Sequence, residues 1–288
     1  MKGLQHSIAQ RLLNISRREG VDNNLITMRY AAERLLYRLG NSKYAEHFIL
    51  KGAVLFWAWY GRGYRTTKDV DLLGIGMPDM ERLKGIFQEI CRMDTQGIDG
   101  MIFLPETVQT TMIQEQQNYP GIRINLSAGL AQIKVSLQID IGFGDAVTPA
   151  AEKMSFPTIL EMPSPEILTY PKYTVLAEKF MAMVVLGMEN SRMKDFYDLM
   201  VMLRKMDFDW DLVEKAVRAT FTTRKNSLPE GMPVALTTVF GTDKLKTVQW
   251  NAFVNRSRLT EPIGQLSDVI QEIGKGLRPL WSRLKIDF

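Results

Sequence analysis

Apolar and polar side chains alternate without interruption between residues 134 and 143. Apolar residues occupy the odd positions from Val135 to Phe143, and the even positions from Ser136 to Asp140 are polar. A period of two places these two sets on opposite faces of a strand, here Lys134–Phe143. The chain must therefore build a sheet that has a core on one face and a polar surface on the other.

The first part of the chain mixes further strand patterns with helical ones. The expected strands are His47–Lys51, a strand around residues 69–73, Met101–Ile113 and Ile122–Leu130. Helical spacing of apolar residues predicts helices at Ser7–Arg17, Asn24–Leu39, Ala53–Trp59 and Pro78–Met93. The first part is therefore expected to be an α/β (α+β) domain with a mixed, partly antiparallel sheet.

Prolines punctuate residues 149–171, which we interpret as a crossing between two domains. Every later segment has a helical pattern: Tyr173–Leu186, Met193–Lys205, Leu212–Thr220, Pro233–Phe240, Lys244–Arg256 and Leu266–Leu284. We expect residues 1–165 to form the α/β domain with its N-terminal helices, and residues 166–288 to form a helical domain.

The composition, 45% hydrophobic and 24% charged, is that of a soluble globular protein. No apolar run approaches the roughly 20 residues that a membrane span requires, and the N-terminus lacks a signal-peptide pattern. Cys91 is the single cysteine, which fits a reducing cytoplasm, and its apolar surroundings indicate a buried core residue rather than a catalytic thiol. We expect a cytoplasmic protein without a membrane partner.

The net charge of +4 arises from the part of the chain that follows Met200. A mildly basic helical region is compatible with a polyanionic partner such as RNA. An ordinary solvated helical surface is the alternative interpretation.

Asp69 and Asp71 stand one residue apart, beside apolar Val70 and Leu72. Alternate residues of a strand share a face, so both carboxylates point the same way with their Cα atoms about 7 Å apart. Their mutual repulsion favours a bound cation, and Mg²⁺ suits a pair of acids that shares it with substrate phosphates. A solvated pair of loop acids is the alternative.

Gly52 separates the strand His47–Lys51 from the helix expected at Ala53–Trp59. A turn of this kind directs backbone N–H groups and the positive end of a helix at a bound anion, commonly a phosphate. Asp140, on the polar face of its strand, is either solvated or completes a cluster with Asp69 and Asp71.

Lys179 lies within an otherwise apolar helical stretch. A cation in such surroundings requires an anionic partner, although most lysines are simply exposed. Downstream, Arg192, Lys194, Asp195 and Asp198 have the spacing of ordinary ion pairs on a helix surface, which is the alternative to a functional role.

Taken in order, these features resemble the polymerase-β-like nucleotidyltransferases, and more closely the AbiEii/AbiGii group of bacterial toxins, whose relatives include the MenT toxins. The resemblance covers about residues 45 to 200. The matching stretches are Phe48–Gly52, Arg65–Leu72, Gln138–Asp145, Ala177–Lys179 and Arg192–Leu199, with weaker likeness at Leu228–Pro229 and Gln249–Phe253.

The resemblance implies a nucleotidyltransferase fold and a role for each matching residue. Asp69, Asp71 and Asp140 would bind Mg²⁺ ions that bridge the phosphates of an NTP, and Asp140 would help to activate the attacking hydroxyl. Lys179, from the helical domain, would neutralise triphosphate charge, and Asp195 would orient Lys179 or the nucleotide. The residues expected around the triphosphate are Lys51, Gly52, Ala53, Arg65 and Thr67.

One position departs from the family pattern. The turn is usually Gly-Gly or Gly-Ser, and here it is Gly52-Ala53. Alanine keeps the backbone N–H but lacks the conformational freedom of glycine and the hydroxyl of serine. Phosphate binding therefore remains the expectation, with one possible side-chain contact removed.

These features lead to a metal-dependent nucleotidyltransferase that moves an NMP from an NTP to a hydroxyl. The resemblance further implies an RNA acceptor, with the 3′ end of tRNA suspected, and a toxin that pairs with a cognate antitoxin protein in a toxin–antitoxin or phage-defence system. One alternative is transfer to a protein or a small molecule such as an antibiotic. Another is a catalytically silent module that holds a nucleotide or a partner protein.

Overall fold

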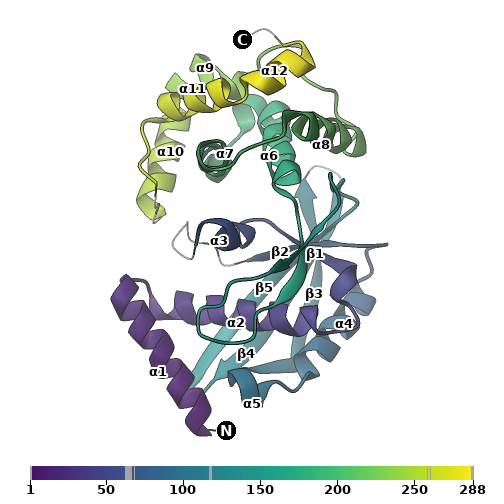
Figure 1. Cartoon of the computed structure of the whole chain (residues 1–288), viewed down its shortest axis with the longest axis vertical. Coiled ribbons are helices and arrows are strands. Elements are labelled where there is room, and N and C mark those ends of the chain that lie inside the picture. Colours follow the sequence, from purple (N-terminus) through teal and green to yellow (C-terminus); the bar gives the residue numbers. More distant parts are fainter. Residues whose placement is uncertain are drawn as a thin grey trace. The chain divides into compact units, whose positions relative to one another are not determined.

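The structure is a computed structural model that describes residues 2–61, 67, 69–116, 119–257, 259 and 261–286. The chain divides into two compact units (Figure 1). The first holds the described residues up to Gly144 together with Glu152–Thr169, and the second holds Asp145–Ala151 and the residues from Tyr170 on. Within the described part, no helix combines the length and the apolarity that a membrane crossing requires.

The first unit contains both helices and strands. Its helices are α1 (Lys2–Glu19), α2 (Asn23–Gly40), η1 (Ala45–His47), α3 (Leu55–Tyr60), α4 (Met80–Arg92) and α5 (Gln96–Asp99). Its strands are β1 (Phe48–Lys51), β2 (Val70–Gly74), β3 (Ile102–Gln116), β4 (Tyr119–Leu130), β5 (Ile133–Phe143), β6 (Glu152–Ser155) and β7 (Glu166–Thr169).

The described strands form one mixed sheet in the order β3-β4-β5-β2-β1-β7-β6. β3, β4 and β5 pair antiparallel, β5 pairs parallel with β2, and β2 pairs antiparallel with β1. The expected mixed, partly antiparallel sheet is thus confirmed. The parallel pairing of β2 with β5 matters most for function, because it joins two segments that are distant in sequence.

The alternation of apolar and polar residues in β4 and β5 decides which face of the sheet is buried. Ile122 and Ile124 on β4, and Ile139 and Ile141 on β5, are all inaccessible to solvent. α2 packs against β5 and β7, and α4 packs against β3. Burial of the apolar set leaves the polar set, which includes Asp140, on the opposite face.

A buried ion pair ties α2 to α5. Arg38 donates to both carboxylate oxygens of Asp99, at 2.8 and 3.3 Å, and both side chains are almost fully buried. Asp99 also accepts from Thr95 Oγ1 and from the backbone N–H of Met101. Tyr30 donates its hydroxyl to the Asp99 carbonyl at 2.8 Å; burial, and next the charge of Asp99, raise the Tyr30 pKa above its ordinary value.

The second unit is helical beyond Tyr170, as predicted. Its elements are α6 (Lys172–Leu186), η2 (Gly187–Glu189), α7 (Met193–Lys205), α8 (Trp210–Thr223), η3 (Val234–Leu236), α9 (Thr238–Thr242), α10 (Lys244–Arg256), α11 (Leu266–Gly276) and α12 (Arg278–Leu284). Phe180 on α6 lies in its core, with its ring centroid 5.5 Å from that of Trp281 and 6.0 Å from that of Phe221.

The Pro-rich segment 149–171 is not the bare crossing that the sequence suggested. It contains β6 and β7, which form an antiparallel pair at the edge of the sheet. Each strand has four residues, and all prolines of the segment lie outside both strands. No proline therefore removes an N–H group from this ladder.

Three predicted helices also differ from the expectation. α4 begins at Met80 rather than at Pro78, because Asp79 is its N-cap and accepts from the Arg82 N–H at 3.0 Å. The helix predicted as Leu266–Leu284 divides at Leu277 into α11 and α12. The predicted helix Pro233–Phe240 is instead the short pair η3 and α9.

Candidate functional site

Gly52 lies directly after β1 with a φ of +73°, a conformation that L side chains rarely adopt. The Asp71 side chain lies against it: a Cβ atom at Gly52 would fall 2.6 Å from Asp71 Cγ and closer still to Oδ2. No side chain fits between the two residues. The glycine that the sequence singled out is therefore required both by its backbone conformation and by close approach of a carboxylate.

The sheet register brings the predicted acids to one face. Asp71 on β2 is the Cα partner of Asp140 on the parallel strand β5. Partners in a ladder point to the same side of a sheet. Asp69 precedes β2, and it lines a groove together with Gln138, which neighbours Asp140 on the same face. Asp71 is also the partner of Lys51 on β1, which is 5% exposed. The three acids that the sequence separates thus occupy neighbouring positions.

Arg123 is a residue of this row that the sequence analysis did not single out. It is the partner of Asp140 on β4 and binds it in a fork, with Nε–Oδ1 and Nη2–Oδ2 both at 2.8 Å. The hydrogen bond to Asp140 raises the Arg123 pKa above its ordinary value, with additional support from the charges of Asp140, Asp69 and Asp71. The sequence alone could have indicated Arg123, because the alternation of apolar and polar residues within Ile122–Leu130 places it on the polar face.

The type of donor at this position suits a hard divalent cation, because carboxylate oxygens are the ligands that Mg²⁺ prefers. The spacing of the acids is a separate matter. Asp140 is engaged by Arg123, and within the described ranges no three acidic, His or Cys side chains are grouped so that they could hold a metal ion together. Asp140 would therefore have to share its carboxylate between Arg123 and the cation.

The turn after β1 differs in detail from the expectation. α3 begins at Leu55 rather than at Ala53 and has six residues, so its macrodipole is weak. Ala53 is 8% exposed and is not among the residues with positive φ, so alanine is accommodated without backbone strain. The departure from the family pattern therefore costs only the serine hydroxyl. Phosphate binding by this turn stays a prediction.

Thr67 and Arg65 are the remaining residues expected around the triphosphate, and the structure describes only Thr67. Thr67, two residues before Asp69, is partly exposed. Arg65 lies outside the described residues.

In the second unit, Lys179 on α6 binds two carboxylates of α7. Its Nζ lies 2.8 Å from Asp195 Oδ1 and 2.7 Å from Asp198 Oδ2, and Arg192 Nε lies 2.7 Å from Asp195 Oδ2. The side chains of Asp195 and Asp198 are 1% and 0% exposed, so the interpretation as surface ion pairs is wrong for them. Asp198 is a partner of Lys179 that the sequence analysis did not assign.

Electrostatics keep Asp195 ionised in this cluster. Burial alone would raise the Asp195 pKa, but the charges of Lys179 and then of Arg192 outweigh it and hold the pKa below its ordinary value. The cluster thus supplies the anionic partners that Lys179 needs within an apolar stretch. Whether Lys179 also binds phosphate stays a prediction.

The thiol of Cys91 takes no part in the chemistry. Cys91 is buried, and burial raises the pKa of its thiol to about 12, so the interpretation as a core residue is confirmed.

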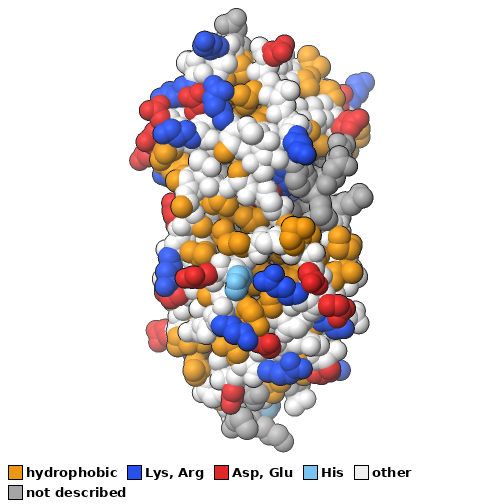
Figure 2. All heavy atoms as spheres, turned by 90° about the vertical axis from the view of Figure 1, so that its right-hand side faces the viewer, with side chains coloured by type: hydrophobic (Ala, Val, Ile, Leu, Met, Phe, Trp, Pro, Cys, Tyr) orange, Lys and Arg blue, Asp and Glu red, His pale blue; other side chains and the backbone are white. Residues whose placement is uncertain are grey.

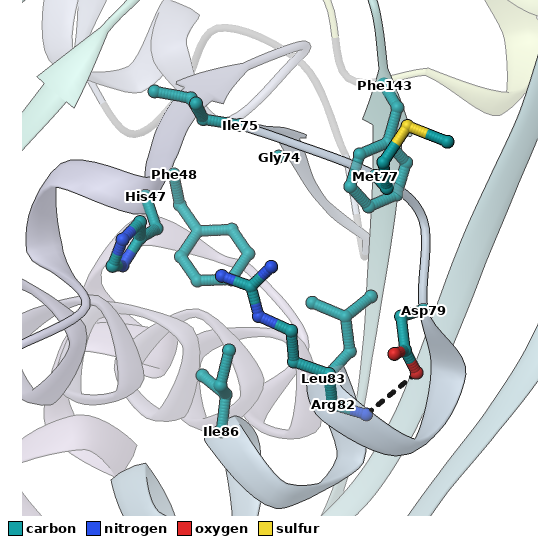
Figure 3. A pocket seen from close by; sticks show the side chains of 10 residues that line it. All are labelled: His47, Phe48, Gly74, Ile75, Met77, Asp79, Arg82, Leu83, Ile86 and Phe143. Atoms are coloured by element: carbon teal, nitrogen blue, oxygen red, sulfur yellow. Dashed lines mark hydrogen bonds between the residues drawn. The ribbon is translucent and has the colours of Figure 1, made fainter.

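A small cavity of the first unit, lined by residues that include His47, Phe48 and Arg82, is shown in Figure 3. Its volume of about 10 Å³ is about that of a single water molecule's site.

Two solved structures share the fold of this chain. A candidate nucleotidyltransferase from H. pylori matches with a TM-score of 0.52 and 12% identity, over 92% of this chain and 98% of that chain. JHP933 from Helicobacter pylori matches with a TM-score of 0.51 and 13% identity, over 92% of this chain and 94% of that chain. At these identities the likeness shows a shared fold. No curated protein is significantly similar to the chain in sequence.

The sequence profile described as the nucleotidyl transferase AbiEii toxin of type IV TA systems matches residues 34–272, which include each candidate site residue. The match confirms the resemblance on which the expected nucleotidyltransferase activity rested. The chain therefore belongs to the AbiEii family of nucleotidyltransferase toxins.

Proposed function

We propose that this nucleotidyltransferase moves a nucleoside monophosphate from an NTP to a hydroxyl of RNA, with the 3′ end of tRNA as the suspected acceptor. The observation that supports the proposal is the register of Asp71 with Asp140, together with the close approach of the Asp71 carboxylate to Gly52. Grouped carboxylates next to a close backbone approach suit phosphoryl transfer, in which catalysis is mostly positioning and charge neutralisation.

Asp69, Asp71 and Asp140 are the residues that would hold Mg²⁺. When bound, the ion would supply neutralisation of phosphate charge. Asp140 is the acid that we assign to the attacking hydroxyl, because it lies one strand further from Gly52 than Asp71 does. Arg123 fixes its orientation through the fork of two hydrogen bonds.

The phosphates of the NTP are assigned to Lys51, Gly52, Ala53, Arg65 and Thr67. Gly52 has no Cβ atom, and this lets the Asp71 carboxylate lie against the backbone at this turn. Lys179 is assigned the role of neutralising phosphate charge. Asp195 is assigned the role of orienting the Lys179 ammonium group through their 2.8 Å ion pair. A rigid, ionised carboxylate keeps the ammonium group in one position, which is what a charge-stabilising residue requires.

Membership of a toxin–antitoxin family implies a cognate antitoxin as a partner. We propose that the activity is toxic to the cell when the antitoxin is absent, and that it serves phage defence. Transfer to a protein or an antibiotic hydroxyl is the alternative acceptor chemistry.

The test incubates the full chain with each labelled NTP, Mg²⁺ and total cellular RNA, and separates RNA, protein and small molecules afterwards. We expect label in RNA, and a fall of at least about 100-fold for Asp69→Asn and Asp71→Asn. Asp207→Asn, an exposed acid on the second unit, is the matched control.

Expression of the wild-type chain without antitoxin is expected to arrest growth, and Asp69→Asn is expected to relieve the arrest. Label in protein or small molecules instead of RNA would establish the alternative acceptor. Equal transfer and equal toxicity for wild type and Asp69→Asn would refute the assignment of the acids.

A further inference from the structure

A groove of about 620 Å³ runs along β3, β4 and β5, and Asp69 is part of its lining. Its volume is within the range of about 300 to 1,000 Å³ that ligand sites occupy. All of its lining residues belong to the first unit. Among its described lining residues, only Asp69 has a role proposed above.

Three amide side chains form a row across the groove. Asn125 on β4 is the register partner of both Gln109 on β3 and Gln138 on β5. Partners of this kind lie on the same face with Cβ atoms about 4.5 to 5.5 Å apart. Gln138 Nε2 also donates to Asp140 Oδ2 at 3.3 Å, so the amide row adjoins the acids.

Two of the three amides, those of Gln109 and Asn125, are available to a ligand. Gln109 and Asn125 are both exposed, and neither side chain makes a hydrogen bond to another residue that the structure describes. Each amide offers two donor hydrogens and an acceptor oxygen. Asn and Gln use this combination to pair with the edges of nucleic-acid bases.

The charge of the groove argues against a phosphate as its guest. Its lining includes Asp69 and Glu106, and no Lys or Arg is among the described lining residues. Nucleic-acid phosphates are bound by cations, so this groove suits a neutral base and its ribose. On the face drawn in Figure 2, basic and acidic side chains are interspersed rather than gathered into a basic stripe.

The strand order places the groove on one side of the acids. β2, which follows Asp69, lies between β1, which ends beside Gly52, and β5, which carries Asp140. In phosphoryl transfer the attacking and leaving oxygens lie roughly in line on opposite sides of phosphorus. With the leaving phosphates beside Gly52, the attacking hydroxyl comes from the β5 side, where the groove continues over β4 and β3.

We propose that this groove binds the unpaired terminal nucleoside of the RNA acceptor, and that Gln109 and Asn125 hydrogen-bond to the edge of its base. The inference rests on the proposed transfer to RNA. It makes the two amides specificity-determining residues, which select the acceptor end and leave NTP binding unchanged.

The test compares the wild-type chain with the double variant Gln109→Leu/Asn125→Leu. The control is Gln132→Leu, which removes an exposed amide from the turn between β4 and β5, outside the groove. Steady-state transfer is measured on an RNA oligonucleotide that the wild type labels, and on the same oligonucleotide with an abasic terminal nucleotide. Urea unfolding checks that each variant folds, and Gln109→Ser/Asn125→Ser replaces the leucine pair if it does not.

We expect the double variant to raise the KM for the intact oligonucleotide about 10- to 100-fold, and the KM for NTP to stay as in wild type. With the wild type, the KM for the abasic oligonucleotide is expected to exceed the KM for the intact one by a similar factor. The double variant should raise the KM for the abasic oligonucleotide little further, because both changes remove the same contact.

Three results overturn the proposal. The first is an unchanged KM for the oligonucleotide, and the second is additive losses from the abasic substrate and the double variant. The third is a raised KM for NTP, which would assign the groove to the base of the donor. In each of these the wild type still labels RNA, whereas a wild type that labels no RNA contradicts the proposed function as well.

Discussion

Arg123 holds Asp140 through two parallel hydrogen bonds, from Nε to Oδ1 and from Nη2 to Oδ2, each 2.8 Å long. Asp140 is in turn the register partner of Asp71. A guanidinium and two carboxylates therefore follow one another across three strands on the same face. A counter-charge of this kind, supplied by the sheet itself, limits the repulsion between acids that phosphoryl transfer needs close together.

Replacing Arg123 with Met should lower the rate of nucleotidyl transfer about 10- to 100-fold, the usual effect of removing a group that orients a metal-binding carboxylate. Arg123→Lys keeps the charge but loses the two-pronged geometry, so an intermediate rate is expected. The measurement is kcat as a function of Mg²⁺ concentration, with Arg11→Met, an exposed residue of α1, as the control. Equal kcat values for wild type and Arg123→Met would contradict the positioning role.

Replacing Gly52 with Ala should both destabilise the fold and impair transfer. The positive φ of Gly52 costs an L residue about 1 to 3 kcal/mol, and the added methyl group displaces the Asp71 carboxylate. Gly85→Ala, in the interior of α4 where a Cβ meets nothing within 4 Å, is the matched control and should be neutral or slightly stabilising. Urea unfolding and transfer assays measure the two effects. A Gly52→Ala variant with wild-type activity would show that Asp71 can move without loss.

Local patterns predicted the elements well because they need only neighbouring residues. The strand expected at Lys134–Phe143 is Ile133–Phe143, and the helices Met193–Lys205 and Lys244–Arg256 are found with the expected ends. The position of Asp140 beside Asp71 could not be derived in this way, because register between distant strands depends on tertiary packing. The resemblance to a family, rather than periodicity, brought those two residues together.

The features that the sequence analysis missed have physical reasons. β6 and β7 have four residues each and lie among prolines that dominate the pattern of their segment. The pairing of Lys179 with Asp198 depends on two helices facing each other, which spacing within one helix does not reveal. Arg123 was visible on the polar face of its strand, but only the register identifies Asp140 as its partner.

Lys179→Met should destabilise the second unit by about 3 to 5 kcal/mol, because it leaves Asp195 and Asp198 buried without their shared counter-charge. Lys215→Met, an exposed residue of α8, is the control. Urea midpoints at pH 7 measure the difference. A midpoint within experimental error of wild type would mean that both acids find other partners.

The lowered pKa of Asp195 predicts how stability depends on pH. A carboxyl whose pKa is lower in the folded chain stabilises the fold fully above its ordinary pKa of about 3.9, and the contribution is lost as the pH falls through the lowered value. Asp195→Asn should be less stable than wild type at pH 7, and this difference in stability should become smaller below about pH 4. Unfolding midpoints between pH 7 and pH 2.5 test this. A gap that stays constant over that range would show that Asp195 does not titrate with folding.

Arg38→Met should destabilise the first unit by about 3 to 5 kcal/mol without changing the chemistry of transfer. The substitution strands Asp99, whose side chain is 0% exposed, without its cationic partner, whereas the acids of the sheet face keep their contacts. Arg17→Met, at the exposed end of α1, is the control. The urea midpoint should fall while kcat per folded molecule, measured well below the midpoint, stays as in wild type. Loss of kcat in a fully folded Arg38→Met chain would instead link this buried ion pair to the geometry of Asp71 and Asp140.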